Sequence, residues 1–231
     1  MSVCCWLLVT DLSAQTGPGG VGNSTSNRLW LKADSKVYND LGVTLAGNGN
    51  SVQQWNDNSG NNNNAIQNTS ANRPFYKINI VNSSPAIQFT GNTFLDPAAL
   101  GIPGNGGFSI ILVFQDTSFV AGAMSDGSGD YIIDRTPATN ELTSLKITDT
   151  DKYGFQKRDD GGSGLGGPVS ITAVSPVSFS IIDYMRDRGI DYRLYLNGSL
   201  ENSAGDADGN LTPPILYYKQ TCLFLKLLKN F

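Results

Sequence analysis

The chain has 231 residues, of which 16% are charged, and its formal net charge is −4. This length suits one β-sandwich of ordinary size better than two domains. An acidic chain without a basic cluster before its last residues is a poor partner for nucleic acid or anionic membrane surfaces, because phosphate groups are neutralised by lysines and arginines on one face. We therefore predict neither partner.

Histidine is absent from the sequence, and Glu141 and Glu201 are the only two glutamates. His-based triads, histidine acid–base catalysis and histidine-ligated metals are thus excluded. Asp183 and Asp187 lie on one expected strand, but a spacing of four residues separates them by roughly 13 Å, too far for a retaining glycosidase pair. We predict no catalytic residue and no enzymatic activity.

The first 15 residues resemble the end of a secretory signal. Val3 to Val9 is apolar, and the small residues before Gln15 suit cleavage near that position. No positive segment precedes the apolar run, so we interpret residues 1–15 as a truncated leader, and a disordered apolar N-terminus as the alternative. The leader predicts a secreted or cell-surface protein whose mature domain does not insert into the membrane.

The following chain alternates short apolar runs with turns, which predicts strands. Arg28 to Asp34 alternates like a strand with one buried face, and Trp30 is either a sheet-packing side chain or an exposed platform for sugars. The most apolar run, Phe108 to Phe114, is expected to be a central strand buried on both faces. Further strands are predicted at Ile78–Ile80, Ala86–Thr90, Tyr131–Arg135, Ser144–Ile147 and Tyr153–Phe155.

One hairpin stands out near the C-terminal end. Val177 to Met185 and Ile190 to Leu196 both alternate and are joined by a turn at Asp187-Arg-Gly189. Asn197-Gly198 then predicts a type I′ turn into another strand, because both residues tolerate positive φ.

The stretch from Val52 to Tyr76 organises the chain. Trp55 supplies an apolar anchor, and Asp57 and Ser59 can accept hydrogen bonds from backbone N–H groups a few residues on. Gly60 and the asparagines that follow tolerate positive φ. This chemistry builds a capped loop and contains no nucleophile with a base.

Four segments together are similar to known domains: the W-x-D-x-S-G-N run at Trp55–Asn61, Arg73-Pro-x-Tyr76, Pro85–Phe89 and Tyr195–Gly198. They resemble the laminin-G-like domains of secreted bacterial surface proteins, within the concanavalin A-like superfamily. The resemblance covers roughly residues 16–212 and implies an all-β, antiparallel two-sheet jelly-roll β-sandwich over residues 16–214. Glucanases of this fold carry a Glu-x-Asp-x-x-Glu strand, and nothing here matches it.

The resemblance implies a non-catalytic binding or adhesion module, part of a larger exported protein, that recognises carbohydrate or a surface protein. A structural spacer without a ligand and, more remotely, a glycan-active enzyme are the alternatives. The sequence assigns no ligand-binding residue.

Calcium is the one cofactor that the sequence suggests. Asp206, Asp208 and Asn210 place oxygens at alternate positions of an expected rim loop, which suits Ca²⁺. Asp126-x-Ser128-x-Asp130 has the same pattern, and Asp57 to Asn68 partly matches an EF-hand loop but lacks its Gly and Glu. Ordinary solvated turn carboxylates are the alternative for all of them.

Residues 215–231 differ in character from the rest. They hold three lysines and no acidic residue, and Cys222 to Leu228 has apolar residues on both faces of a would-be strand. We interpret this tail as an out-of-frame or chance terminus, and expect it to be less ordered than the sandwich and to leave the first strand without a partner.

Overall fold

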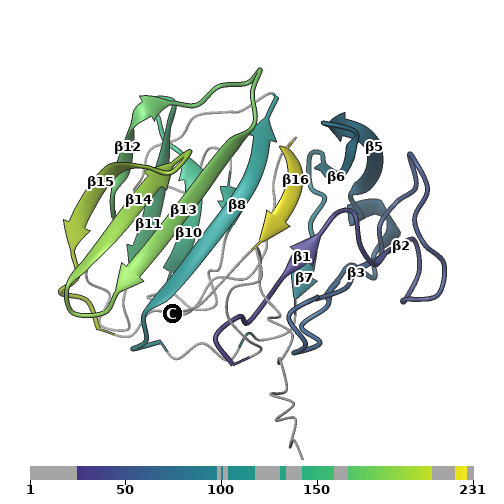
Figure 1. Cartoon of the computed structure of the whole chain (residues 1–231), viewed down its shortest axis with the longest axis horizontal. Helices are drawn as coiled ribbons and strands as arrows, with labels where there is room; N and C mark the ends of the chain where they lie inside the picture. The colour runs from purple at the N-terminus through teal and green to yellow at the C-terminus, as the bar shows by residue number, and fades with distance from the viewer. Residues whose placement is uncertain are drawn as a thin grey trace, which may run out of the picture.

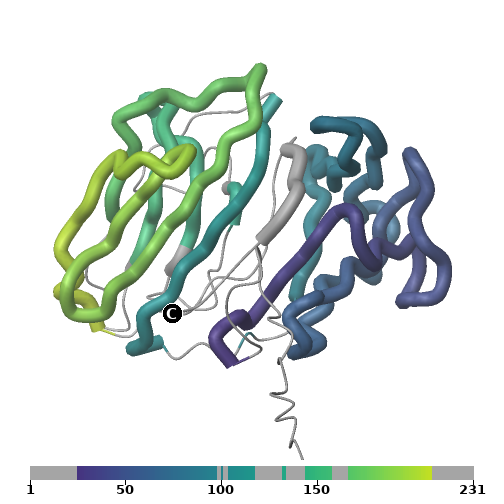
Figure 2. Tube along the Cα trace, viewed as in Figure 1, coloured from purple at the N-terminus to yellow at the C-terminus, as the bar shows by residue number. Residues whose placement is uncertain are grey.

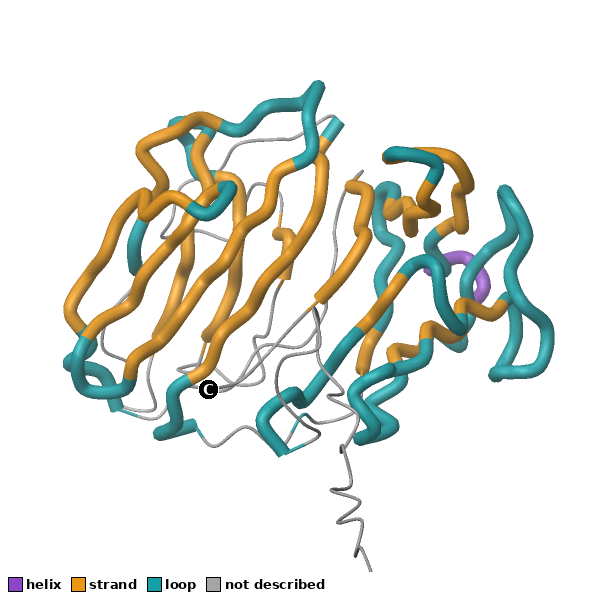
Figure 3. Tube along the Cα trace, viewed as in Figure 1, coloured by secondary structure: helices purple, strands orange, loops and turns teal. Residues whose placement is uncertain are grey.

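The structure is a computed structural model that describes residues 25–97, 100, 104–117, 131–133, 142–158, 166–209 and 222–227. Within these ranges all strand pairs are antiparallel. The helical part of the described chain is one 3-10 turn, η2 (Ser70–Asn72), visible in Figure 3. The predicted all-β, antiparallel class is therefore confirmed. The leader, residues 1–15, lies outside the described residues.

The largest sheet has eight strands and runs across the whole molecule (Figure 1). Along the sheet the strands are β15 (Ser199–Gly205), β14 (Asp191–Leu196), β13 (Ser180–Asp187), β8 (Phe108–Asp116), β16 (Cys222–Leu227), β6 (Ser84–Phe89) and β5 (Phe75–Val81), with β1 (Leu31–Lys32) paired to β16.

A second sheet packs against the inner face of β13 and β8 and forms the sandwich (Figure 1). Its strands are β12 (Val169–Ala173), β11 (Lys152–Arg158), β10 (Leu142–Ile147) and β9 (Tyr131–Ile133). Aromatic rings join the two layers. Phe155 stacks on Tyr184 with centroids 3.4 Å apart, and Phe114 meets Tyr153 edge-on at 5.5 Å. Offset and edge-on contacts of this kind stabilise a core beyond simple area burial.

A third, small sheet lies at the other end of the molecule, in the N-terminal part of the tube in Figure 2. It contains β2 (Val37–Tyr38), β3 (Gln54–Trp55), β4 (Ala65–Ile66) and β7 (Asp96–Pro97). Trp55 is buried here and donates its indole N–H to the Lys32 carbonyl at 2.8 Å. The predicted anchor role of Trp55 is confirmed.

Asp57 is the hub of the loop that follows Trp55. Its buried carboxylate accepts hydrogen bonds from the backbone N–H groups of Trp30 (2.8 Å), Ser59 (2.8 Å) and Asn63 (3.1 Å), and from the Ser59 hydroxyl (2.6 Å). The bond to Trp30 ties the loop to the chain just before β1. Asp57 therefore caps the loop, as the sequence predicts. Its carboxylate oxygens point toward backbone N–H groups of the protein itself.

The expected central strand corresponds to β8, but it is fully buried on one face only. Phe108, Leu112 and Phe114 are buried among the core residues, whereas Ile111 and Val113 are half-buried. The reason is that the second sheet covers only the inner face of β8, so the alternate side chains belong to the outer surface of the sandwich.

The two predicted turns near the C-terminal end are confirmed. β13 and β14 form a ladder that runs from Ile182, opposite Leu196, to Asp187, opposite Asp191. Asn197 and Gly198 have φ values of 50° and 84° and connect β14 to β15. Because successive side chains of a strand point to opposite faces, this register determines which side chains of these strands face inward and which face outward.

One expectation for the tail is wrong, namely that it leaves the first strand without a partner. The interpretation of residues 215–231 as an out-of-frame and less ordered terminus stays a prediction. Strand β16 lies between β8 and β6 in the middle of the large sheet, and it also pairs with β1, Leu31 opposite Leu227 (Figure 1). The first strand therefore has a partner. Apolar residues on both faces are typical of a strand in a covered part of a sheet, and the paired position of β16 is compatible with that pattern.

Candidate functional site

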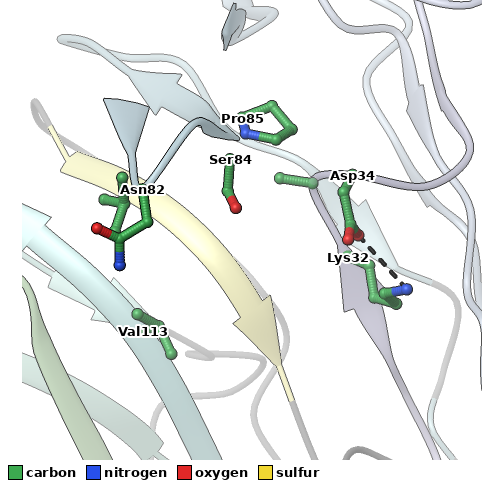
Figure 4. A pocket seen from close by; sticks show the side chains of 8 residues that line it. Lys32, Asp34, Asn82, Ser84, Pro85 and Val113 are labelled. Carbon is green, nitrogen blue, oxygen red and sulfur yellow. Dashed lines mark ion pairs between the residues drawn. The ribbon is translucent and has the colours of Figure 1, made fainter. Parts of the chain in front are cut away.

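A pocket of about 220 Å³ opens over the large sheet, between β1, the β5–β6 turn and β8 (Figure 4). Its walls combine apolar groups with one ammonium, one carboxylate, one amide and one hydroxyl. The lining residues are Lys32, Ala33, Asp34, Val81, Asn82, Ser84, Pro85 and Val113. Mostly apolar walls with a few polar groups are the usual composition of a small-molecule site.

The β5–β6 turn supplies one side of the pocket. Asn82 and Ser83 have φ values of 47° and 63°, and Val81 pairs with Ser84 across the turn. Two successive residues at positive φ make the tight turn that matches strand twist, and Asn tolerates this conformation better than most residues. Asn82 and Ser84 are exposed and lie on the side of the pocket opposite Lys32 and Asp34 (Figure 4).

The segment at β1 supplies the other side. Leu29, Leu31 and Ala33 are buried, so the alternate residues face outward, as the sequence predicts. The Lys32 ammonium lies 3.5 Å from the Asp34 carboxylate and 5.4 Å from the Trp30 ring centroid. Because this ion pair is partly exposed, it contributes little to stability, and both charges can exchange partners with a ligand. Half-buried Trp30 packs under Lys32.

The outer face of the sheet continues from the pocket onto β13 and β14. Val113 on β8 lies opposite Ile181 on β13. Two residues earlier in β8, Ile111 points to the same face and lies opposite Asp183. Asp183 in turn lies opposite Tyr195 on β14. Side chains at alternate positions share one face, so these residues and Val113 form one continuous surface.

Asp183 is half-buried on this face, and the Ser109 hydroxyl lies 3.3 Å from its carboxylate. Burial raises the pKa of Asp183, which the Ser109 hydrogen bond offsets only in part. Asp187 instead lies 3.8 Å from the Arg193 guanidinium. The two carboxylates that the sequence placed on one strand thus share a face but have different partners.

The predicted metal ligands Asp206 and Asp208 point into the protein. The Arg186 guanidinium binds Asp206 in bidentate fashion at 2.9 and 3.2 Å, and both side chains of this ion pair are fully buried. Arg186 also donates to the carbonyls of Gly104 (2.8 Å) and Gly209 (3.0 Å). Burial raises the pKa of Asp206, but hydrogen bonds from Arg186 and two backbone N–H groups outweigh this and hold its pKa below 3.8.

Asp208 has a similar environment. Its carboxylate is bonded to the Lys157 ammonium and accepts a hydrogen bond from the Tyr192 hydroxyl at 2.8 Å. Burial raises the pKa of Tyr192 well above its usual range, so the hydroxyl stays protonated and donates. Both carboxylates are buried, so the alternative that they are ordinary solvated turn carboxylates is wrong.

The calcium site stays a prediction. Asn210 and the Asp126–Asp130 run lie outside the described residues, and within the described part no group of three or more Cys, Asp or Glu residues is placed to hold a metal ion. Arg186 and Lys157 carry the positive charge that a cation at Asp206 and Asp208 would supply. A calcium ion there must displace these side chains.

Thermal unfolding in EDTA and in 5 mM CaCl₂ tests the calcium site. A free site with a Kd of about 10⁻⁴ M would stabilise the protein by roughly 2 kcal/mol at this concentration. Because both carboxylates already have cationic partners, we expect a smaller upward shift of the midpoint. Equal unfolding midpoints in the two buffers would rule out calcium binding at Asp206 and Asp208.

Sequence reasoning missed the pocket. The alternation around Lys32 places that residue on an outward face, and Asn82-Ser83 between two expected strands is a turn signal. Neither pattern indicates that β1 and the β5–β6 turn lie close together. They meet because β16, from the far end of the chain, pairs with both β1 and β6.

No protein-family model matches the chain, and no curated protein matches it. Solved structures do match. The binding domain of Paraclostridial Mosquitocidal Protein 1 has 14% identity and a TM-score of 0.59 over 90% of this chain and 49% of its own. The ligand-binding domain of botulinum neurotoxin serotype D, solved with N-acetylneuraminic acid, has 13% identity and a TM-score of 0.59 over 90% and 48%.

Domain 4 of an extracellular arabinanase from Geobacillus stearothermophilus, solved with arabinotriose, has 11% identity and a TM-score of 0.50 over 68% of this chain and 75% of its own. This chain spans about half the length of the two toxin chains it matches. At such identities the likeness shows the fold alone, which is the β-sandwich described above. Among the described residues no helix has the length and apolarity needed to cross a membrane.

Proposed function

We propose that this protein is a non-catalytic carbohydrate-binding module and that the pocket between β1 and the β5–β6 turn holds the sugar. The observation that carries the proposal is the lining itself. Apolar Val81, Pro85 and Val113 suit the C–H groups of a sugar ring, while Lys32, Asp34 and Asn82 offer donors and acceptors to its hydroxyls. Figure 4 shows the polar groups on opposite sides of the opening.

The similar structures support the same class. Two of them were solved with a sugar bound, N-acetylneuraminic acid in one and arabinotriose in the other. Because they share only the fold with this chain, they support carbohydrate as the ligand class without selecting a sugar. A surface protein as ligand, or a spacer without a ligand, is the alternative. We also propose a secreted or cell-surface location, in line with the leader-like N-terminus.

The binding proposal predicts that Asn82→Gly weakens glycan binding about five- to thirtyfold, since one lost hydrogen bond of about 1 to 2 kcal/mol has this effect. Glycine keeps the positive φ of the turn while removing the amide. The measurement is titration calorimetry with the best ligand from a glycan array.

Asn79→Gly is the matched control, because Asn79 is also exposed and at positive φ (55°) but does not line the pocket. It should leave the affinity unchanged. Equal affinities of Asn82→Gly, Lys32→Met and the parent protein for an array hit would place the binding elsewhere, and the absence of any hit would favour the spacer.

We expect no hydrolysis of the glycans that bind. Asp183 and Asp187 have separate partners in Ser109 and Arg193, and neither is placed to act with the other as acid and nucleophile. Product analysis by chromatography after prolonged incubation tests this. Turnover that disappears in Asp183→Asn would contradict it.

A further inference from the structure

We propose that the binding surface extends from the pocket across β8 and β13 to Asp183 and Tyr195, and that its ligand is an uncharged glycan chain of several sugars. This inference rests on the proposed carbohydrate function and goes beyond it in ligand length and charge. It depends on three observations: the continuity of the outer face, the chemistry of its side chains and the distribution of charge.

The register of the strands makes the surface continuous. Val113 lines the pocket and lies opposite Ile181, and the next outward row joins Ile111, Asp183 and Tyr195 across three neighbouring strands. With strands about 4.8 Å apart and about 6.7 Å between outward residues of one strand, Tyr195 lies roughly 12 Å from Val113. This span exceeds one sugar ring, so a ligand that reaches both ends must be a chain.

The far end of the surface carries groups suited to a sugar. Tyr195 is half-exposed and offers a flat apolar ring with a hydroxyl at its tip. Asp183 lies beside it and has two acceptor oxygens. The apolar side chains of Ile111 and Val113 lie between this end and the pocket, which leaves a smooth strip along which a chain can lie.

Asp183 is poorly explained by stability alone. It is half-buried, and its described contact is a 3.3 Å hydrogen bond with Ser109 rather than an ion pair with a cation. Burial raises the pKa of its carboxyl group, which means that folding disfavours the charged form. Residues that lower stability in this way are concentrated at functional sites, and the outward position of Asp183 gives it access to a ligand.

The charges on this face indicate an uncharged ligand. The described carboxylates are those of Asp34, Asp183, Asp187 and Asp191. The cations whose side chains are described are Lys32, paired with Asp34 at 3.5 Å, and Arg193, paired with Asp191 at 2.9 Å and Asp187 at 3.8 Å. A third basic residue, Lys226 of β16, lies at the register position opposite Lys32 and Val113. Lys32 and Arg193 each have a carboxylate beside them, and with Asp183 the positions on this face hold four carboxylates against three cations. An acidic sugar would meet like charge, which opposes binding.

Calorimetry on the full chain tests the inference, using neutral gluco-, xylo-, arabino-, manno- and fructo-oligosaccharides of two to six units, with oligogalacturonides and sialyllactose as acidic probes. Affinity for one neutral series should rise at least tenfold from two to four units. Tyr195→Ala should abolish that rise and leave the affinity for the disaccharide within twofold, whereas Tyr195→Phe, which keeps the ring, should retain most of it.

Asp183→Asn is the second variant. We expect it to weaken binding of the four-unit chain about tenfold without lowering the thermal midpoint, because the lost charge was opposed by burial. A midpoint that falls by several degrees would give Asp183 a structural role and overturn its place in the site.

The outcomes separate this inference from the proposed function. Binding that depends on Asn82 but not on chain length or Tyr195, or that prefers the acidic probes, overturns the inference and leaves the carbohydrate function standing. Binding that depends on neither Asn82 nor Tyr195, or no binding to any probe, overturns both.

Discussion

Replacing Arg186 with methionine is expected to destabilise the protein by about 3 to 5 kcal/mol, the usual effect of removing one partner from a buried ion pair. The variant leaves the Asp206 carboxylate buried without its bidentate partner and also removes donors from the carbonyls of Gly104 and Gly209. Urea unfolding at pH 7, followed by tryptophan fluorescence, measures the change. A loss below about 1 kcal/mol would show that water or another cation replaces the guanidinium.

Arg193→Met is the matched control, since Arg193 lies on the neighbouring strand and also forms two ion pairs, but with partly exposed partners. Its unfolding midpoint should stay close to that of the parent chain. Combining Arg186→Met with Asp206→Leu should recover a large part of the loss, because the double variant leaves no unpaired charge inside.

The pH dependence provides a second measurement of the same ion pair. The folded pKa of Asp206 lies below its ordinary value of 3.8, so ionised Asp206 stabilises the folded state fully above pH 3.8. This stabilisation is lost as the pH falls through the folded pKa. Between pH 5 and pH 2 the parent chain should therefore lose more stability than Asp206→Asn does.

Asp57→Ala is expected to destabilise the protein by about 2 to 5 kcal/mol. The carboxylate accepts four hydrogen bonds, and its loss leaves the buried donors of Trp30 and Ser59 without their acceptor, each at about 1 to 3 kcal/mol before relaxation. Because the bond to Trp30 holds the loop against the chain before β1, the Lys32 side of the pocket should also loosen. Urea unfolding gives the stability, and hydrogen exchange at residues 28–34 gives the local effect.

Asp40→Ala provides a control with the same chemistry at the surface. The Asp40 carboxylate also accepts from two backbone N–H groups, those of Val43 at 2.8 Å and Thr44 at 2.9 Å, but these hydrogen bonds are exposed to solvent. Water can replace it there, so the unfolding midpoint should hardly change. If both variants lost equal stability, burial would not be the reason for the importance of Asp57.

The sandwich therefore separates two kinds of polar group. The charged groups Arg186, Asp206, Lys157 and Asp208 lie inside, where they hold the segment after β15 against β13 and β11. The proposed binding groups lie outside, on β1, the β5–β6 turn, β13 and β14. Substitutions in the first set should act on stability, and those in the second on binding.

The sequence alone was sufficient for the class of fold and for most strands. Period-two alternation and turn residues are local signals, so Asn197-Gly198, the β13–β14 hairpin and the Trp55–Asp57 loop were predicted correctly. The same locality explains the errors. The pattern of Phe108 to Phe114 shows that both faces are apolar, but it does not show that the second sheet covers only one of them.

Long-range pairing was decided only by the tertiary structure. Alternating carboxylates at Asp206 and Asp208 look the same in sequence whether they face solvent or a cation, and Arg186 and Lys157 are 20 and 51 residues away from them. The pocket arises in the same way, because β16 pairs with both β1 and β6 and brings Lys32 to Asn82. Propensity and alternation act over a few residues, whereas strand order is fixed by which distant faces bury each other, and the site of this protein depends on that order.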